Sequence, residues 1–157
     1  ALVIIGIQIY FIREISEQQQ KVLSHKRVML YLIWTCFAIT IYQMFLGTQV
    51  RESIDELTKY GIGRDRWVEE LGLPFYIHRS FSWLVLVFIA IIAWKNEQLK
   101  KYPIIRFLFI VLLLELISGI LLAYFDMPGL VQTAHLVFAT ILFGILTMMV
   151  FRSKSVT

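Results

Sequence analysis

Cysteine, proline and charge are all scarce in this sequence. Its 157 residues include one cysteine and three prolines; 17% are charged and 59% are hydrophobic. The single cysteine, Cys36, cannot form a disulfide within the chain, which excludes a disulfide-stapled fold. The charges lie at the ends of apolar runs and form no basic patch, so no nucleic-acid partner is expected despite the net charge of +4.

Four apolar stretches are long enough to cross a membrane, at residues 28–50, 74–94, 104–125 and 130–151. At a rise of about 1.5 Å per residue, each matches a hydrocarbon core of about 30 Å. The sequence therefore predicts an all-α, polytopic membrane protein embedded in the lipid bilayer. Its four helices are expected to form an up-down bundle over residues 28–151, with an external loop at 51–73 that holds short interfacial helices.

The chain opens with an apolar run that is too short to cross a bilayer. We interpret residues 1–12 as the end of a truncated further transmembrane helix, because no basic segment precedes them as in a signal peptide. The sequence is then expected to be part of a longer protein. Residues 13–27 form a basic link, and residues 95–106 and the tail at 152–157 are also basic. The positive-inside rule predicts that all three are cytoplasmic, the C-terminus included.

Each predicted membrane helix carries one strongly polar side chain in its apolar stretch. Polar groups in such helices are costly, and by default they mark function. Each is followed four residues later by a small residue, which shares its helix face. The pairs are Gln43 with Gly47, His78 with Ser82, Glu115 with Gly119, and His135 with Ala139.

His78 and His135 are predicted to lie at similar depth near the outer face, on two inward-running helices that can be diagonal in the bundle. Facing histidines beside small residues favour a flat macrocycle whose iron takes both imidazoles as axial ligands. Gln43 and Glu115 are candidate acceptors for the remaining ring N–H groups. A zinc site is less suited, because two nitrogens are offered without a thiolate or carboxylate cluster.

Other interpretations of the polar residues stay open at this point. A single histidine in a membrane helix is often an interhelical hydrogen-bond donor, and glycines are often packing notches. Glu115 suits either a structural hydrogen bond or a proton path. Arg51 and Arg79 lie where helices meet the external loop, so they are candidates to pair with the propionates of a haem.

Three segments together resemble the second half of the haem A synthase family. They are YQMFLGTQVRE (42–52), IHRSFSW (77–83) and LELISGILLAYFDMPGLVQTAHLVFATILFG (114–144). That family oxidises a methyl of haem O to the formyl of haem A for haem-copper oxidases, and its longer members have two homologous four-helix halves. The resemblance implies that His78 and His135 ligate a haem b, and that haem O binds the other half.

The resemblance also implies limits on what this segment does. The family's substrate half has a Glu-x-x-His motif, but Phe75 and Gln132 stand three residues before the two histidines here. We therefore expect a cofactor-binding half of an oxidoreductase that is not catalytic alone. The implied partners are the missing N-terminal half, haem O, haem O synthase and oxidase assembly factors. The implied location is the bacterial cytoplasmic membrane, or the mitochondrial inner membrane in a eukaryote.

Two other functions fit the same four helices. A stand-alone b-type cytochrome would pass electrons within the membrane, but such proteins often stack histidine pairs near both faces, whereas this chain has one pair near one face. A cofactor-free assembly factor would leave the polar constellation unexplained.

Overall fold

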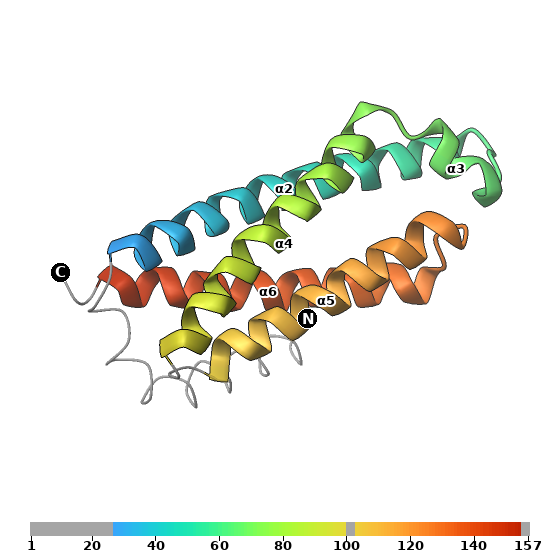
Figure 1. Cartoon of the computed structure of the whole chain (residues 1–157). Coiled ribbons are helices and arrows are strands. Elements are labelled where there is room, and N and C mark those ends of the chain that lie inside the picture. Colours follow the sequence, from blue (N-terminus) through green and yellow to red (C-terminus); the bar gives the residue numbers. More distant parts are fainter. Residues whose placement is uncertain (1–26, 100–102, 155–157) are drawn as a thin grey trace.

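A computed structural model describes residues 27–99 and 103–154, and it is entirely helical over these ranges (Figure 1). The helices are α2 (Arg27–Lys59), α3 (Arg64–Glu70), α4 (Leu73–Leu99), α5 (Pro103–Tyr124) and α6 (Gly129–Lys154). The helix tail predicted at residues 1–12 and nearly all of the link at 13–27 lie outside the described residues, as do 155–157.

The four long helices form an up-down bundle, as the sequence predicts. Successive long helices run in opposite directions, so that α3 and the α5–α6 turn lie at the same end (Figure 1). Helix α2 packs mainly against α4 and α6, and α5 also packs mainly against α4 and α6. Helices α4 and α6 are therefore diagonal partners across the bundle.

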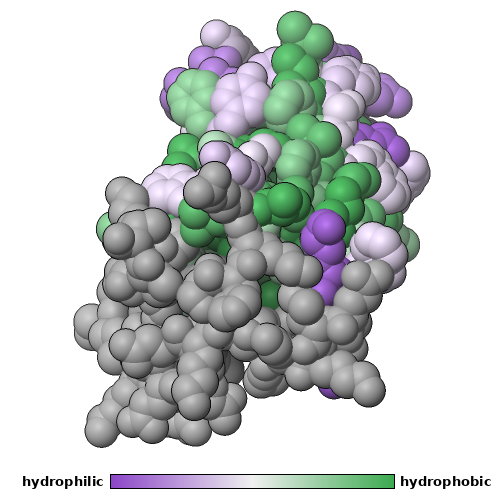
Figure 2. Space-filling model, turned by 60° about the vertical axis from the view of Figure 1, so that its left-hand side comes forward, coloured by the Kyte–Doolittle hydropathy of each residue, from purple (hydrophilic) through white to green (hydrophobic). Residues whose placement is uncertain are grey.

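Four helical segments are long and apolar enough to cross a membrane: Val28–Lys59, Leu73–Lys95, Ile104–Tyr124 and Gly129–Phe151. Many of their large apolar side chains are exposed, and hydrophobic residues cover much of the described surface in Figure 2. Such exposure is unfavourable in water but suits contact with lipid tails. The exposed apolar side chains thus agree with a bundle whose outer surface faces lipid.

The segment expected as an external loop, 51–73, is largely helical. Helix α2 continues past Val50 to Lys59, and an i,i+4 ion pair joins Arg51 and Asp55 at 2.9 Å. The helix stops where Gly61 adopts a φ of 71° and the N–H of Ile62 donates to the carbonyl of Leu57 at 3.0 Å. This is a glycine-capped helix end, and the short α3 follows it.

Two apolar clusters hold the bundle, one toward each end. The larger, inner cluster is drawn from all four long helices and includes the fully buried Ile33, Ile89, Leu108 and Leu146. The outer cluster joins α2, α3, α4 and the α5–α6 turn through Ile54, Trp67, Leu71, Phe75 and Met127. The polar side chains described below lie between these clusters.

The turn between α5 and α6 uses a left-handed backbone without glycine. Asp126 has a φ of 55° and Met127 a φ of 52°. The N–H of Met127 donates to the carbonyl of Leu122 at 3.3 Å, so Asp126 holds the helix-capping position that usually favours glycine. Met127 is 3% exposed, and its side chain completes the outer cluster.

Asp126 and Met127 share the strained backbone but differ in burial, which makes them a matched pair. We expect Asp126→Gly to leave the bundle as stable or to stabilise it by up to about 1 kcal/mol, because glycine relieves the left-handed strain. We expect Met127→Gly to destabilise it by about 2–5 kcal/mol, because a buried side chain is lost. Thermal unfolding in detergent, followed by near-ultraviolet circular dichroism, measures both. Equal losses from the two substitutions would contradict this account.

Candidate functional site

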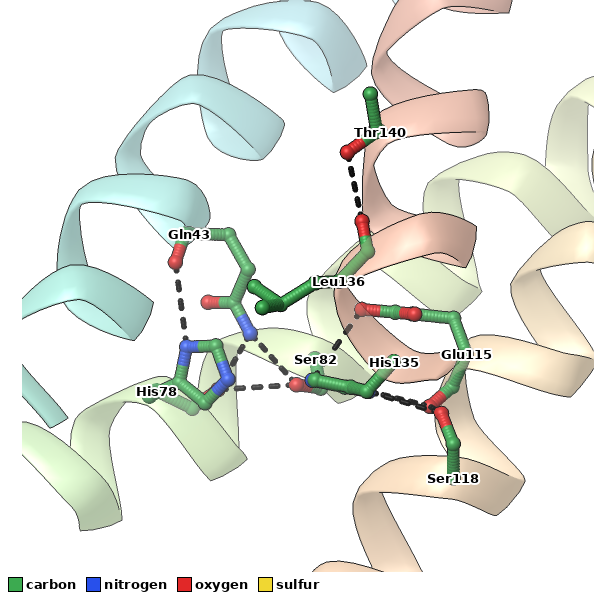
Figure 3. Close-up of polar contacts among 8 residues, drawn as sticks. All are labelled: Gln43, His78, Ser82, Glu115, Ser118, His135, Leu136 and Thr140. Carbon is green, nitrogen blue, oxygen red and sulfur yellow. Dashed lines mark hydrogen bonds and ion pairs between the residues drawn. The ribbon is translucent and has the colours of Figure 1, made fainter. Parts of the chain in front are cut away.

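The site lies between two helical hairpins. The first hairpin is α2 with α4, the second is α5 with α6, and each contributes one histidine. His78 projects from α4 toward α2, and His135 projects from α6 toward α5 (Figure 3). The centroids of the two imidazole rings are 6.5 Å apart, and the ring planes are inclined at 79°. The expectation that these two histidines meet across the bundle therefore agrees with their positions.

In the first hairpin, main-chain atoms hold the histidine. The Nδ1 atom of His78 is 3.2 Å from the carbonyl oxygen of Gln43. Because a carbonyl can only accept, this contact requires the ring proton on Nδ1. The amide of Gln43 donates to the carbonyl of His78 at 2.7 Å and to the hydroxyl of Ser82 at 2.6 Å. The side chain of Gln43 thus supports the turn of α4 that carries the ring, and the main-chain carbonyl of Gln43 orients the ring.

In the second hairpin, the histidine has the same main-chain contact and two more. The Nδ1 atom of His135 is 3.2 Å from the carbonyl oxygen of Glu115 and 2.9 Å from the hydroxyl of Ser118. The Nε2 atom of His135 lies 3.3 Å from Oε1 of Glu115. Glu115 therefore contacts both sides of this ring, one with its backbone and one with its side chain.

Glycine allows both rings to approach the preceding helix. A Cβ atom built on Gly47 would lie 3.4 Å from Cε1 of His78, and one built on Gly119 would lie 3.4 Å from Cε1 of His135. The imidazole therefore packs directly on the helix surface at both places. The carbonyl that contacts the ring belongs to the residue four positions before each glycine, Gln43 or Glu115. The carbonyl acceptor and the glycine notch therefore share one helix face.

The two hairpins repeat the same arrangement with different side chains. Gln43 corresponds to Glu115, Gly47 to Gly119, His78 to His135, and Ser82 to the half-buried Ala139. The main-chain contact and the glycine contact have equal lengths in the two hairpins. The polar side chains differ: the hydroxyl of Ser82 accepts from the amide of Gln43, whereas Ala139, at the equivalent place, has no side-chain hydroxyl to offer Glu115.

Two buried acceptor atoms beside the rings have no hydrogen-bond partner. They are Oε1 of Gln43 and Oε2 of Glu115, one from each hairpin. Leaving a buried polar atom unsatisfied costs free energy, so native structures rarely keep one without a reason. Each histidine therefore has beside it a polar atom with unused capacity for a hydrogen bond.

The two arginines predicted at the outer interface are exposed and lie on different helices. Arg51 donates to Oε1 of Gln132 at 2.7 Å and pairs with Asp55. Arg79 donates to the hydroxyl of Tyr124 at 3.3 Å, with its guanidinium 5.9 Å from that ring's centroid. Both guanidinium groups therefore face the α5–α6 hairpin across the outer end of the bundle.

Sequence reasoning gave no role to two residues that the structure places at the site. Ser118 is buried and contacts His135, and Gln132 links Arg51 to the carbonyl of Met127, to which its amide donates at 2.8 Å. Ser118 directly precedes the notch glycine Gly119, which is a signal that the sequence offers. The partner of Gln132 lies 81 residues away, so no local pattern predicts it.

Within residues 27–99 and 103–154, no group of three or more His, Cys, Asp or Glu side chains is arranged to hold a metal ion. A haem iron, by contrast, needs only the two axial ligands that a histidine pair offers, since the porphyrin supplies the other four.

Curated relatives of this chain are named Heme A synthase. One from Rickettsia massiliae (strain Mtu5) is 28% identical over 127 residues, which are 79% of this chain and 35% of that protein. Another, from Wolbachia pipientis subsp. Culex pipiens (strain wPip), is 38% identical over 69 residues, which are 44% of this chain and 20% of that protein. The chain thus matches about a third or less of these relatives' length. No solved structure shows a significant match.

A family model matches almost the whole chain, from residue 1 to residue 147. The match covers both histidines, both notch glycines, the whole of α2, α4 and α5, and most of α6. With the apolar bundle and the relatives named above, it shows that this chain is an integral membrane protein belonging to the cytochrome oxidase assembly protein family, COX15-CtaA.

Proposed function

We propose that this chain is the haem b-binding half of a haem A synthase, with His78 and His135 as the iron ligands. The observation that carries the proposal is the pair of imidazole rings, 6.5 Å apart between centroids on diagonal helices. The family and the relatives named Heme A synthase support a role in haem chemistry. The whole enzyme's reaction, oxidation of haem O to haem A, is part of the proposal.

The spacing and the donor set both fit a bis-histidine iron. Two metal–nitrogen bonds of about 2 Å each place the ring centroids of two axial imidazoles about 6 Å apart. The carbonyls of Gln43 and Glu115 accept the Nδ1 protons, which leaves the Nε2 lone pairs as the donors. When bound, haem b supplies one-electron oxidation and reduction.

The residues around the rings have distinct tasks in this proposal. Gly47 and Gly119 let the imidazoles lie against α2 and α5, so the rings keep one orientation. The carboxyl of Glu115 contacts the donor atom Nε2 of His135, so it must give way when that atom ligates iron. Gln43 braces the turn of α4 that carries His78. These contacts support pre-orientation of both ligands before the cofactor arrives.

Arg51 and Arg79 are proposed to hold the haem propionates at the outer face. Both are exposed at the outer end, and guanidinium groups pair well with carboxylates. Positive-inside orientation would place this end away from the cytoplasm and the C-terminus within it. The membrane concerned would be the bacterial cytoplasmic or the mitochondrial inner membrane.

This half is proposed to need the other half for catalysis. Oxidation of haem O requires a second porphyrin site, and the described bundle brings together one histidine pair. Glu115 is the carboxylate beside that pair, and it already contacts one of the proposed ligands. The proposed partners are therefore the missing half and haem O, together with haem O synthase and oxidase assembly factors.

Replacing either proposed ligand should remove the haem signature. We expect His78→Ala and His135→Ala each to abolish or strongly alter the low-spin b-type spectrum of the purified chain, because one axial bond is lost. His25→Ala, the substitution of the third histidine, is the control and should leave the spectrum unchanged. The measurement is a reduced-minus-oxidised difference spectrum. The ligand assignment is wrong if both ligand variants keep the wild-type spectrum.

Neutralising an outer arginine should weaken haem binding without changing its ligation. We expect Arg51→Gln or Arg79→Gln to lower haem affinity about ten- to hundredfold, because a hydrogen bond to a charged group contributes about 1.5–3 kcal/mol. Titration with haem measures the affinity, and the low-spin spectrum should persist. Arg66→Gln on α3, where Arg66 pairs with Glu70 instead, serves as the control. Unchanged affinity in both test variants would refute the propionate assignment.

The chain expressed alone should not make haem A. We expect a cell that accumulates haem O, and that lacks any full-length haem A synthase, to contain no haem A when it expresses residues 1–157. Extraction of the haems followed by chromatography measures this directly. A cell that expresses a full-length enzyme is the positive control. Haem A produced by the segment alone would show that the catalytic residues lie in this half.

A further inference from the structure

The internal repeat shows that the two histidines are held unequally. Residues 46 and 118 are equivalent, since each directly precedes a notch glycine. The chain has Leu46 at one and Ser118 at the other, and both are buried, at 3% and 4% exposed. Only the serine can bond to a ring nitrogen. A hydroxyl therefore contacts a ring nitrogen of His135, whereas the hydroxyl near His78, that of Ser82, bonds to Gln43 and to the carbonyl of His78.

The hydroxyl of Ser118 extends the main-chain contact of His135 into a short chain of hydrogen bonds. It donates to the carbonyl of Glu115 at 2.8 Å, so its oxygen is free to accept from Nδ1–H of His135 at 2.9 Å. The same ring nitrogen is 3.2 Å from that carbonyl. Two acceptors thus face one N–H, whereas Nδ1 of His78 contacts the carbonyl of Gln43.

We propose that Ser118 is a positioning residue that makes His135 the stronger electron donor of the two iron ligands. The inference rests on the haem b site proposed above. An N–H group that donates to better acceptors makes its imidazole more basic, and a more basic ligand favours the ferric state. Ser118 acts through His135 and is not itself in contact with iron. The repeat is thereby built from similar hairpins but gives the iron two unequal axial ligands.

The inference predicts opposite effects at the two equivalent positions. Ser118→Ala should lower ferric haem affinity about tenfold, as loss of an outer hydrogen-bond partner typically does. If ferrous affinity is unchanged, the midpoint potential rises by about 59 mV for that tenfold change. Leu46→Ser, which offers His78 a similar hydroxyl, should lower the potential. Ser118→Thr keeps the hydroxyl and should stay close to wild type.

The test uses the 157-residue chain purified in detergent and loaded with haem b. Redox titration gives the midpoint potential, haem titration gives the affinity, and electron paramagnetic resonance of the ferric form reports ligand strength. Ser53→Ala is the matched control, because the half-buried hydroxyl of Ser53 donates to the carbonyl of Gln49 within α2 at 3.1 Å, ten residues beyond Gln43. A purely structural role for Ser118 would not move the potential in opposite directions at positions 118 and 46.

Three results would overturn the inference. The first is a Ser118→Ala protein with wild-type potential and affinity. The second is a Leu46→Ser protein whose potential does not fall, which decides the matter even if Ser118→Ala fails to fold. The third is a wild-type chain with no low-spin haem b spectrum, which would overturn the proposed function as well. The first two leave the proposed function intact, so the two failures are distinguishable.

Discussion

The contact between each histidine ring and a backbone carbonyl of the preceding helix is the interaction on which the rest of this site depends. Nδ1 of His78 and Nδ1 of His135 lie 3.2 Å from the carbonyls of residues 43 and 115. Such a contact fixes both the tautomer and the direction of the ring. Glycine one turn further along favours this contact, because a Cβ atom there would already touch the ring, 3.4 Å from its Cε1 atom, and would leave no room for a longer side chain in that direction.

The bundle surrounds this polar layer with two apolar clusters that have different tasks. The inner cluster packs the four long helices against one another. The outer cluster, with Trp67 and Met127, joins α3 to the α5–α6 turn. Arg64 and Gln132 both donate to the carbonyl of Met127, at 3.0 Å and 2.8 Å. The outer ends of the two hairpins are therefore tied together above the histidines.

The two hairpins repeat one arrangement with a few changed side chains, which makes them similar yet unequal. The geometry of ring, carbonyl and glycine is conserved between the hairpins, whereas Gln43 and Leu46 are replaced by Glu115 and Ser118. The His78 ring contacts a main-chain carbonyl, and the side chains of Gln43 and Leu46 add no bond to it. The His135 ring also contacts the carboxyl of Glu115 and the hydroxyl of Ser118. Within a shared backbone frame, these few positions set the polarity around the two histidine rings.

Much of this architecture follows from the sequence alone, because membrane helices impose local rules. Long apolar runs must be helical in lipid, since their backbone groups have no water to bond. Four helices, their alternation and the pairing of His78 with His135 were accordingly predictable from residue spacing. So was the break at Gly61, because glycine readily takes a positive φ.

Tertiary structure decided the contacts that join residues far apart in the chain. Helical structure within 51–73 was predicted, but its continuity with α2 was not, and neither was the packing of Ile54 with Trp67 of α3 and Met127. The bonds of Ser118 to His135 and of Arg51 to Gln132 likewise join different helices. Spacing along a helix tells which residues share a face, but the rotation of one helix against another determines which atoms meet. That rotation is set by side-chain packing over the whole interface, and so it appears only once the bundle is assembled.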